Sequence, residues 1–126
     1  MTESLRALER PEASDAERLA ADPVLRAAVE RWLQVAVEGA IDATQHVVAH
    51  EGWTPPTTAR ATFLTLAGHG VIDVALATRL GRAAALRNLL GHDYAEVDLV
   101  RLAAIVRDDL GDLRVLAKAL APWIDS

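Results

Sequence analysis

Residues 22–52 read DPVLRAAVERWLQVAVEGAIDATQHVVAHEG, and they predict the main element of the fold. Apolar residues recur in it at spacings of three and four, which is typical of one face of an α-helix. Asp22 suits the N-cap of that helix, Pro23 its first position and Gly52 its end. The pattern therefore predicts an amphipathic helix of roughly 28 residues, about 40 Å long at the rise of an α-helix.

Three further helices are predicted after this one. The loop GWTPPTT comes first, and either of its last two threonines can cap a helix over residues 59–68. After a Gly-His-Gly turn, Asp73 can cap the next helix, which we expect to run to about Leu90. The last helix is expected to start at about Asp98 and to be terminated by Pro122.

The chain before the long helix completes the predicted domain. Residues 1–21 read as one or two short helical pieces, with Pro11 as a break or restart. Neither strand-like alternation nor an internal repeat is visible, and long helices joined by short turns predict an all-α, up-and-down bundle of about five helices. We expect one domain over residues 1–126, with 1–21 as a short N-terminal segment and 22–121 as the core bundle.

Composition excludes several classes of protein. Hydrophobic residues make up 52% of the chain, enough for a real core, and the 4% of aromatic residues favours helices over a β-sandwich. Because cysteine is absent, neither a disulfide framework nor a thiolate metal site is possible. The first residues are charged throughout and no apolar run approaches the length of a membrane span, so we expect a cytoplasmic protein without membrane association.

Charge is distributed unevenly. The net charge of −5 argues against a protein that coats nucleic acid in general. Between Gly52 and His92, however, the only acid is Asp73, whereas the same segment contains four arginines: Arg60, Arg79, Arg82 and Arg87. Such a basic segment could receive a phosphate backbone, or it could be a solvated helix face. Charge alone leaves both interpretations open.

The only tyrosine of the chain lies in RNLLGHDY, residues 87–94. Gly91 suits the position just after a helix, so Arg87 would lie on the last helical turn and His92 and Tyr94 just beyond it. Residues five apart on a continuous helix diverge by about 140°, whereas a break at Gly91 lets Arg87 and His92 turn into one cleft.

The chemistry of that cleft would suit RNA. Histidine exchanges a proton near neutral pH, and the arginine fork fits phosphate, while Asn88 adds a neutral donor and acceptor. A base and a phosphate clamp, with no required metal, fit attack by an RNA 2′-hydroxyl on its own phosphodiester. The alternative is that Arg87 and His92 are cations favoured by the dipole at a helix C-terminus.

RNLLGHDY matches the signature R-x4-H-x-Y of HEPN ribonucleases, and it resembles most closely the HepT-type toxins. Residues 22–73 are similar to that family's second helix, loop and following helix and turn, and residues 97–113 resemble its final helix. The resemblance covers roughly 100 residues. It implies a HEPN-like helical bundle and a metal-independent endoribonuclease, the toxin of a toxin–antitoxin pair.

The resemblance also implies roles and partners. Arg87 and His92 become the catalytic pair, Asn88 a polar supporter and Tyr94 the site of adenylylation. Toxins of this family form homodimers with a composite active-site cleft, and their antitoxin is a minimal nucleotidyltransferase of the MntA type that modifies the motif tyrosine. RNA would be the substrate, with Arg79 and Arg82 as further candidates for phosphate contacts.

A second function from another class stays open. HEPN-like bundles also occur as non-catalytic companions of nucleotidyltransferases, in which the motif would bind a nucleotide or substrate without cutting RNA. Neither interpretation requires a metal or another cofactor, and we expect none.

Other polar and aromatic residues have plainer explanations. His46 and His50 share a helix face, but without a third ligand we expect a partly buried His46 and an exposed His50. His69 is expected to be a surface turn residue. Trp53 and Trp123 could pack across a subunit contact or cover one end of the bundle, and the sequence favours neither.

Three aspartates gather on the last predicted helix. Asp108, Asp109 and Asp112 could hold Mg²⁺ as paired carboxylates, but we expect a solvated acidic face instead. Such a face could also contact the arginines of a partner protein.

Overall fold

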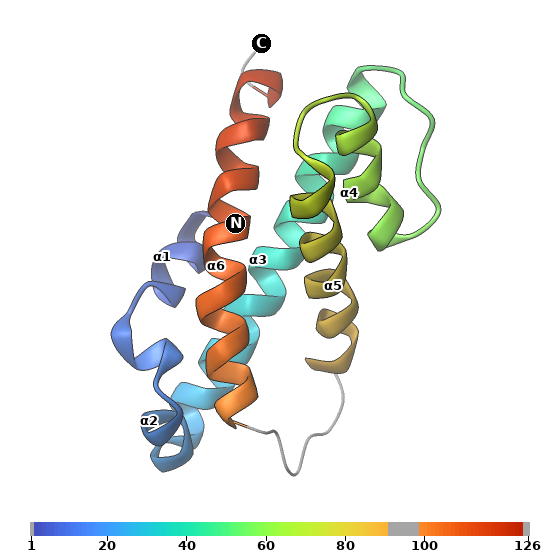
Figure 1. The fold of residues 1–126 in the computed structure, drawn as a ribbon. Coiled ribbons are helices and arrows are strands. Elements are labelled where there is room, and N and C mark those ends of the chain that lie inside the picture. The colour runs from blue at the N-terminus through green and yellow to red at the C-terminus, as the bar shows by residue number, and fades with distance from the viewer. Residues whose placement is uncertain (1, 91–98, 125–126) are drawn as a thin grey trace.

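The computed structural model describes residues 2–90 and 99–124, with the backbone alone for residues 2, 86–90 and 101. Every regular element in those ranges is helical, which confirms the predicted all-α bundle (Figure 1). The elements are α1 (Thr2–Leu8), the 3-10 helix η1 (Pro11–Ser14), α2 (Ala16–Ala21), α3 (Pro23–His50), α4 (Ala59–Gly68), α5 (Val74–Leu90) and α6 (Leu99–Ile124).

Helix α3 has the predicted length of 28 residues and the predicted ends. The Asp22 carboxylate accepts hydrogen bonds from the backbone N–H groups of Val24 and Leu25, both at 3.1 Å, and Pro23 takes the first helical position. At the other end Gly52 has φ 72°, a left-handed conformation that favours glycine. The backbone N–H of Trp53 then bonds to the Val48 carbonyl at 3.0 Å, which closes the helix.

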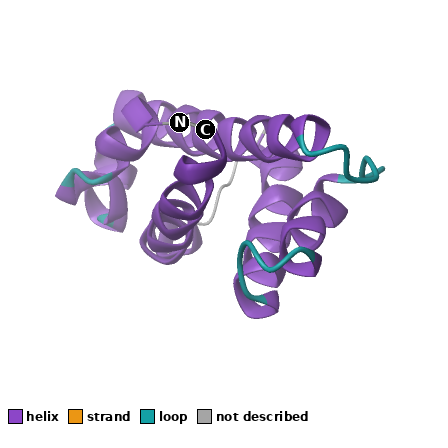
Figure 2. Cartoon of the chain, turned by 90° about the horizontal axis from the view of Figure 1, so that it is seen from above, coloured by secondary structure: helices purple, strands orange, loops and turns teal. Residues whose placement is uncertain are grey.

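Helix α3 is the central helix of the bundle. In Figure 1 it rises in the same direction as α6, whereas α5 runs the opposite way, and Figure 2 shows the other helices arrayed along it. Its inner face contributes a continuous apolar stripe to the core: Val29, Leu33, Ala36, Val37, Ala40, Ile41, Val47 and Val48. Burial of this stripe removes apolar surface from water and is the main source of stability.

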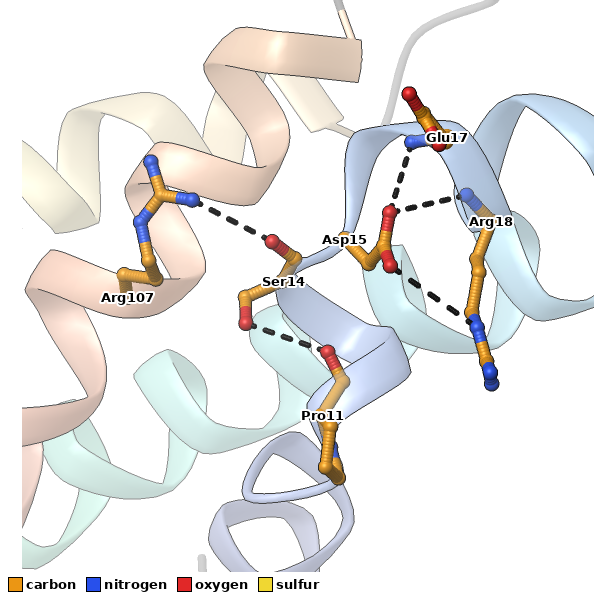
Figure 3. A network of polar contacts seen from close by, with 6 residues as sticks. All are labelled: Pro11, Ser14, Asp15, Glu17, Arg18 and Arg107. Atoms are coloured by element: carbon orange, nitrogen blue, oxygen red, sulfur yellow. Dashed lines mark hydrogen bonds and ion pairs between the residues drawn. The ribbon is translucent and has the colours of Figure 1, made fainter.

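The N-terminal segment is tied to the core by polar contacts as well as by packing. Pro11 begins η1, so the chain is interrupted where the sequence predicted (Figure 3). Asp15 caps α2 by accepting from the N–H groups of Glu17 and Arg18, and Arg107 of α6 donates to the Ser14 carbonyl at 3.4 Å. Arg114 of α6 also forms an ion pair with Glu9.

Helix α6 packs through side chains at helical spacing, all at most 1% exposed: Leu102, Val106, Leu113, Leu116 and Leu120. The predicted end at Pro122 is wrong, because the helix continues through that residue to Ile124. The reason lies in packing. Pro122 is exposed, while the next residue, Trp123, packs edge-on against Trp53 with 5.4 Å between ring centroids. The packed tryptophan holds the last turn although the proline cannot donate a hydrogen bond.

Helices α4 and α5 form an antiparallel pair. Thr58, one of the two predicted caps, accepts from the N–H of Ala61 at 3.0 Å and starts α4. Asp73 caps α5 as predicted, accepting from the N–H of Leu76 at 2.7 Å. Across the described ranges, no helix combines the length and apolar character needed to cross a membrane.

Candidate functional site

Helix α5 carries the first half of the motif. Arg87 and Asn88 lie in its last turn, at the end of the bundle where α6 begins (Figure 1). Residues 91–98, which include His92 and Tyr94, lie outside the described residues. The catalytic role of Arg87 and His92, the supporting role of Asn88 and the modification of Tyr94 therefore stay predictions.

The arginines of α5 lie at different angles around the helix. At about 100° per residue, the position of Arg87 is about 80° around the helix from Arg79 and about 140° from Arg82. The buried residues of α5, Leu76, Ala77, Leu80, Ala83 and Ala84, continue in register toward Arg87. The position of Arg87 thus extends the inner face of α5, while Arg82 is exposed on the outside.

Arg79 is already engaged within the bundle. Its Nε donates to Oδ2 of Asp112 on α6 at 3.0 Å, and this hydrogen bond and charge raise the pKa of the Arg79 guanidinium. The contact joins α5 to α6. The predicted contact between Arg79 and RNA phosphate remains untested, and an RNA phosphate there would compete with a carboxylate.

Asp109 corrects the expectation of a solvated acidic face. Its position continues the buried seam of α6 between Val106 and Leu113, and its Oδ2 is buried without a hydrogen-bond partner. Burial, helped by the neighbouring charges of Asp112 and Asp108, raises the pKa of Asp109 to about 6. Of these three aspartates only Asp108 is exposed, so the group is part core and part surface.

The three histidines away from the motif, His46, His50 and His69, are all exposed. Within the described residues, no group of three or more potential ligands gathers. The rings of His46 and His50 are 6.4 Å apart, and His46 is exposed, which corrects the expectation of partial burial. That face of α3 points to solvent because the core stripe occupies the other.

An aromatic group closes the end of the bundle opposite the last turn of α5. Trp53 stacks on the exposed ring of His69, with centroids 3.8 Å apart and planes within 3°, and meets Trp123 edge-on. Of the two interpretations left open for these tryptophans, the structure supports covering of the bundle end. His69 is a surface turn residue, as predicted, but its ring also packs against Trp53.

One arginine of the basic segment has a packing role that the sequence did not indicate. Arg60, in the first turn of α4, packs over Gly81 of α5, and a Cβ added at Gly81 would lie 3.0 Å from the Arg60 Cγ. A glycine in the middle of a helix costs about 1 kcal/mol relative to alanine, so it usually has a packing reason. That isolated glycine was the available signal, but the sequence does not tell which residue lies over it.

Comparison with known proteins identifies the family. A family model described as Ribonuclease HepT-like matches residues 1–120. The mRNA nuclease HepT of Shewanella oneidensis is 30% identical over 98 residues, which span 78% of this chain and 74% of that protein.

Solved structures agree on the fold. The tri-AMPylated HEPN toxin of S. oneidensis, in complex with MNT antitoxin, matches with a TM-score of 0.83 at 24% identity, over 94% of this chain and 88% of that chain. A toxin–antitoxin structure with AMP-PNP matches with a TM-score of 0.80 at 25% identity, over 93% of this chain and 92% of that chain. The fold is therefore that of a HEPN-type helical bundle. Because the family model covers nearly the whole chain, the protein belongs to the HepT-like ribonuclease family.

Proposed function

We propose that this chain is the toxin of a toxin–antitoxin pair and acts as a metal-independent endoribonuclease. The observation that carries the proposal is the R-x4-H-x-Y motif in a chain of the HepT-like family, with its arginine on the last turn of α5. The curated relative is named an mRNA nuclease, which supports RNA as the substrate.

The proposed chemistry uses two side chains on one phosphodiester. Arg87 would hold the scissile phosphate and stabilise the charge that develops on it. His92 would take the proton of the 2′-hydroxyl or return one to the leaving 5′-oxygen, and Asn88 would orient the phosphate. Two protomers would contribute these residues to one cleft, so we propose a homodimer as the active form.

The first test is cleavage of single-stranded RNA by the purified chain with and without EDTA. We expect the same rate in both, because the proposed acid–base chemistry needs no bound cation. Loss of cleavage in EDTA that Mg²⁺ restores would contradict metal independence. Absence of cleavage in either condition, together with harmless expression of the chain alone, would favour the non-catalytic companion instead.

The second prediction concerns inhibition. We propose that an MntA-type nucleotidyltransferase adenylylates Tyr94, which places bulk and negative charge where RNA phosphate must enter. The matched structure of the tri-AMPylated HEPN toxin in complex with MNT antitoxin supports this partner.

Because Tyr94 is the only tyrosine, intact mass after incubation with the partner and ATP gives a direct readout. We expect the parent chain to gain adenylate units and Tyr94→Phe to gain none while keeping its cleavage activity. A mass increase that persists in Tyr94→Phe would show that another residue is modified.

A further inference from the structure

The outer face of α3 carries a pair of histidines one helical turn apart. His46 and His50 are both exposed, and their ring centroids lie 6.4 Å apart with 40° between the ring planes. Residues four apart on a helix project from the same face, so both imidazoles reach the same region of solvent. Neutral imidazole is the commonest metal ligand in proteins, and two adjacent exposed rings can take one ion between them.

The distance between the two rings is close to that of a shared ion. A zinc–nitrogen bond is about 2.0–2.1 Å long, so an ion held by two imidazoles at a tetrahedral angle places the ring centroids about 5 Å apart. From the observed 6.4 Å, the rings would have to approach each other by about 1 Å. The His50 side chain is 61% exposed, and exposed side chains change rotamer within nanoseconds. Rotation of the two side chains is therefore enough to close the pair on an ion.

Glu51 favours one nitrogen of His50 as the ligand. Oε1 of Glu51 lies 3.6 Å from Nδ1 of His50. A histidine that binds a metal usually turns its other ring N–H toward a carboxylate, which fixes the orientation and tautomer of the ring. With Nδ1 on the side of Glu51, Nε2 is the nitrogen of His50 that remains for an ion.

The charge of this part of the chain favours a cation. Residues 32–59 contain three acids and neither lysine nor arginine: Glu38, Asp42 and Glu51. Asp42 precedes His46 by one turn of α3, so its carboxylate belongs to the same face of the helix. Negative charge beside the two imidazoles attracts a cation and opposes an anion. Among cations, Mg²⁺ and Ca²⁺ prefer oxygen ligands, whereas imidazole suits zinc, nickel and copper.

We propose that His46 and His50 bind one divalent transition-metal ion, with water completing its coordination and Glu51 holding the His50 ring. This end of α3 is opposite the last turn of α5, so the ion takes no part in RNA cleavage and the site is independent of the proposed function (Figure 1). The ion joins residues 46 and 50 across the last turn of α3, just before the chain turns at Gly52. Because it binds the folded helix, the ion stabilises this end of the bundle.

The test is calorimetric titration of the chain with Zn²⁺, using protein without a histidine tag. We expect His46→Gln and His50→Gln each to weaken Zn²⁺ binding by more than about tenfold, because either change removes one of two protein ligands. Glu51→Gln should weaken it by roughly tenfold, the lower end of the usual cost of losing a carboxylate behind a ligating histidine. Cu²⁺ should bind more tightly than Zn²⁺, and an excess of Mg²⁺ should not displace either ion.

His69→Gln is the matched control. His69 is an exposed histidine at the same end of the bundle, but its ring stacks on Trp53 instead of facing a second histidine. Its replacement should leave the affinity for Zn²⁺ at the parent value. Equal affinities of His46→Gln and His69→Gln would place the ion elsewhere on the chain and overturn the proposal.

Thermal unfolding gives a second, independent measurement. Without metal, His46→Gln, His50→Gln and the parent should unfold at the same temperature, because the changed side chains are exposed. Added Zn²⁺ should raise the unfolding temperature of the parent and of His69→Gln but of neither other variant. A rise of the same size in His46→Gln, or no rise in the parent at saturating Zn²⁺, would contradict an ion held across the end of α3.

Discussion

His92→Ala is expected to lower the rate of RNA cleavage by about 10²–10⁴-fold, the usual contribution of a general acid–base group. Alanine cannot take the proton of the attacking 2′-hydroxyl or return one to the leaving oxygen. RNA binding should be nearly unchanged, because the arginines supply most of the attraction to phosphate. Single-turnover cleavage of a defined RNA measures the loss, and release from growth inhibition should accompany it.

His50→Ala is the matched control for this variant. His50 is an exposed histidine at the end of α3, and that end of the bundle is opposite the last turn of α5 (Figure 1). Its removal should leave cleavage at the parent rate. Parent-like cleavage by His92→Ala would remove the histidine from the mechanism, and parent-like cleavage by Arg87→Ala would do the same for the phosphate clamp.

Asp109→Asn is expected to raise the free energy of unfolding at pH 7.5. Since burial raises the pKa of Asp109 from 3.8 to about 6, the folded chain holds the proton more tightly than the unfolded chain does. The stability linked to that proton is complete below pH 3.8 and is lost as the pH rises through about 6. A pKa shift of this size corresponds nominally to about 3 kcal/mol in the free energy of unfolding. Because the side chain is partly exposed, solvent screening reduces this contribution to about 1–2 kcal/mol.

The pH dependence distinguishes this origin from ordinary packing. Urea unfolding of the parent and of Asp109→Asn should give a gap between their free energies of unfolding at pH 7.5, and this gap should shrink toward zero as the pH approaches 4. Asp108→Asn removes a neighbouring, exposed carboxylate and should change stability much less at either pH. A gap of constant size across this range would mean that the buried charge is not its cause.

Helix ends and the long α3 were predictable because their causes are local. Asp22 with Pro23, Thr58 and Asp73 act on backbone N–H groups two or three residues away, and Gly52 permits a conformation that other residues resist. Such effects can be read from neighbouring letters. The candidate motif could be proposed for the same reason, since Arg87, His92 and Tyr94 fall within eight residues, and the roles of these residues stay predictions.

The features that sequence missed depend on which helix lies opposite. Asp109 and Leu110 are adjacent and both partly buried, and only the packing of α6 decides that the Asp109 carboxylate is buried along with the neighbouring leucine. Pro122 was expected to end the helix, but the contact of Trp123 with a loop some seventy residues earlier decided otherwise. Arg60 reaches Gly81 only because α4 folds back on α5. In each case a tertiary contact overrides the default behaviour of the residue type.

The aromatic group of Trp53, His69 and Trp123 gives the protein an internal optical probe. Indole emission responds to the polarity and contacts of its surroundings, and two of the three tryptophans lie at the end of the bundle opposite the start of the motif. A motif variant that loses activity while its emission spectrum matches the parent's has therefore kept this end folded. Intrinsic fluorescence can thus separate loss of chemistry from loss of structure without any added label.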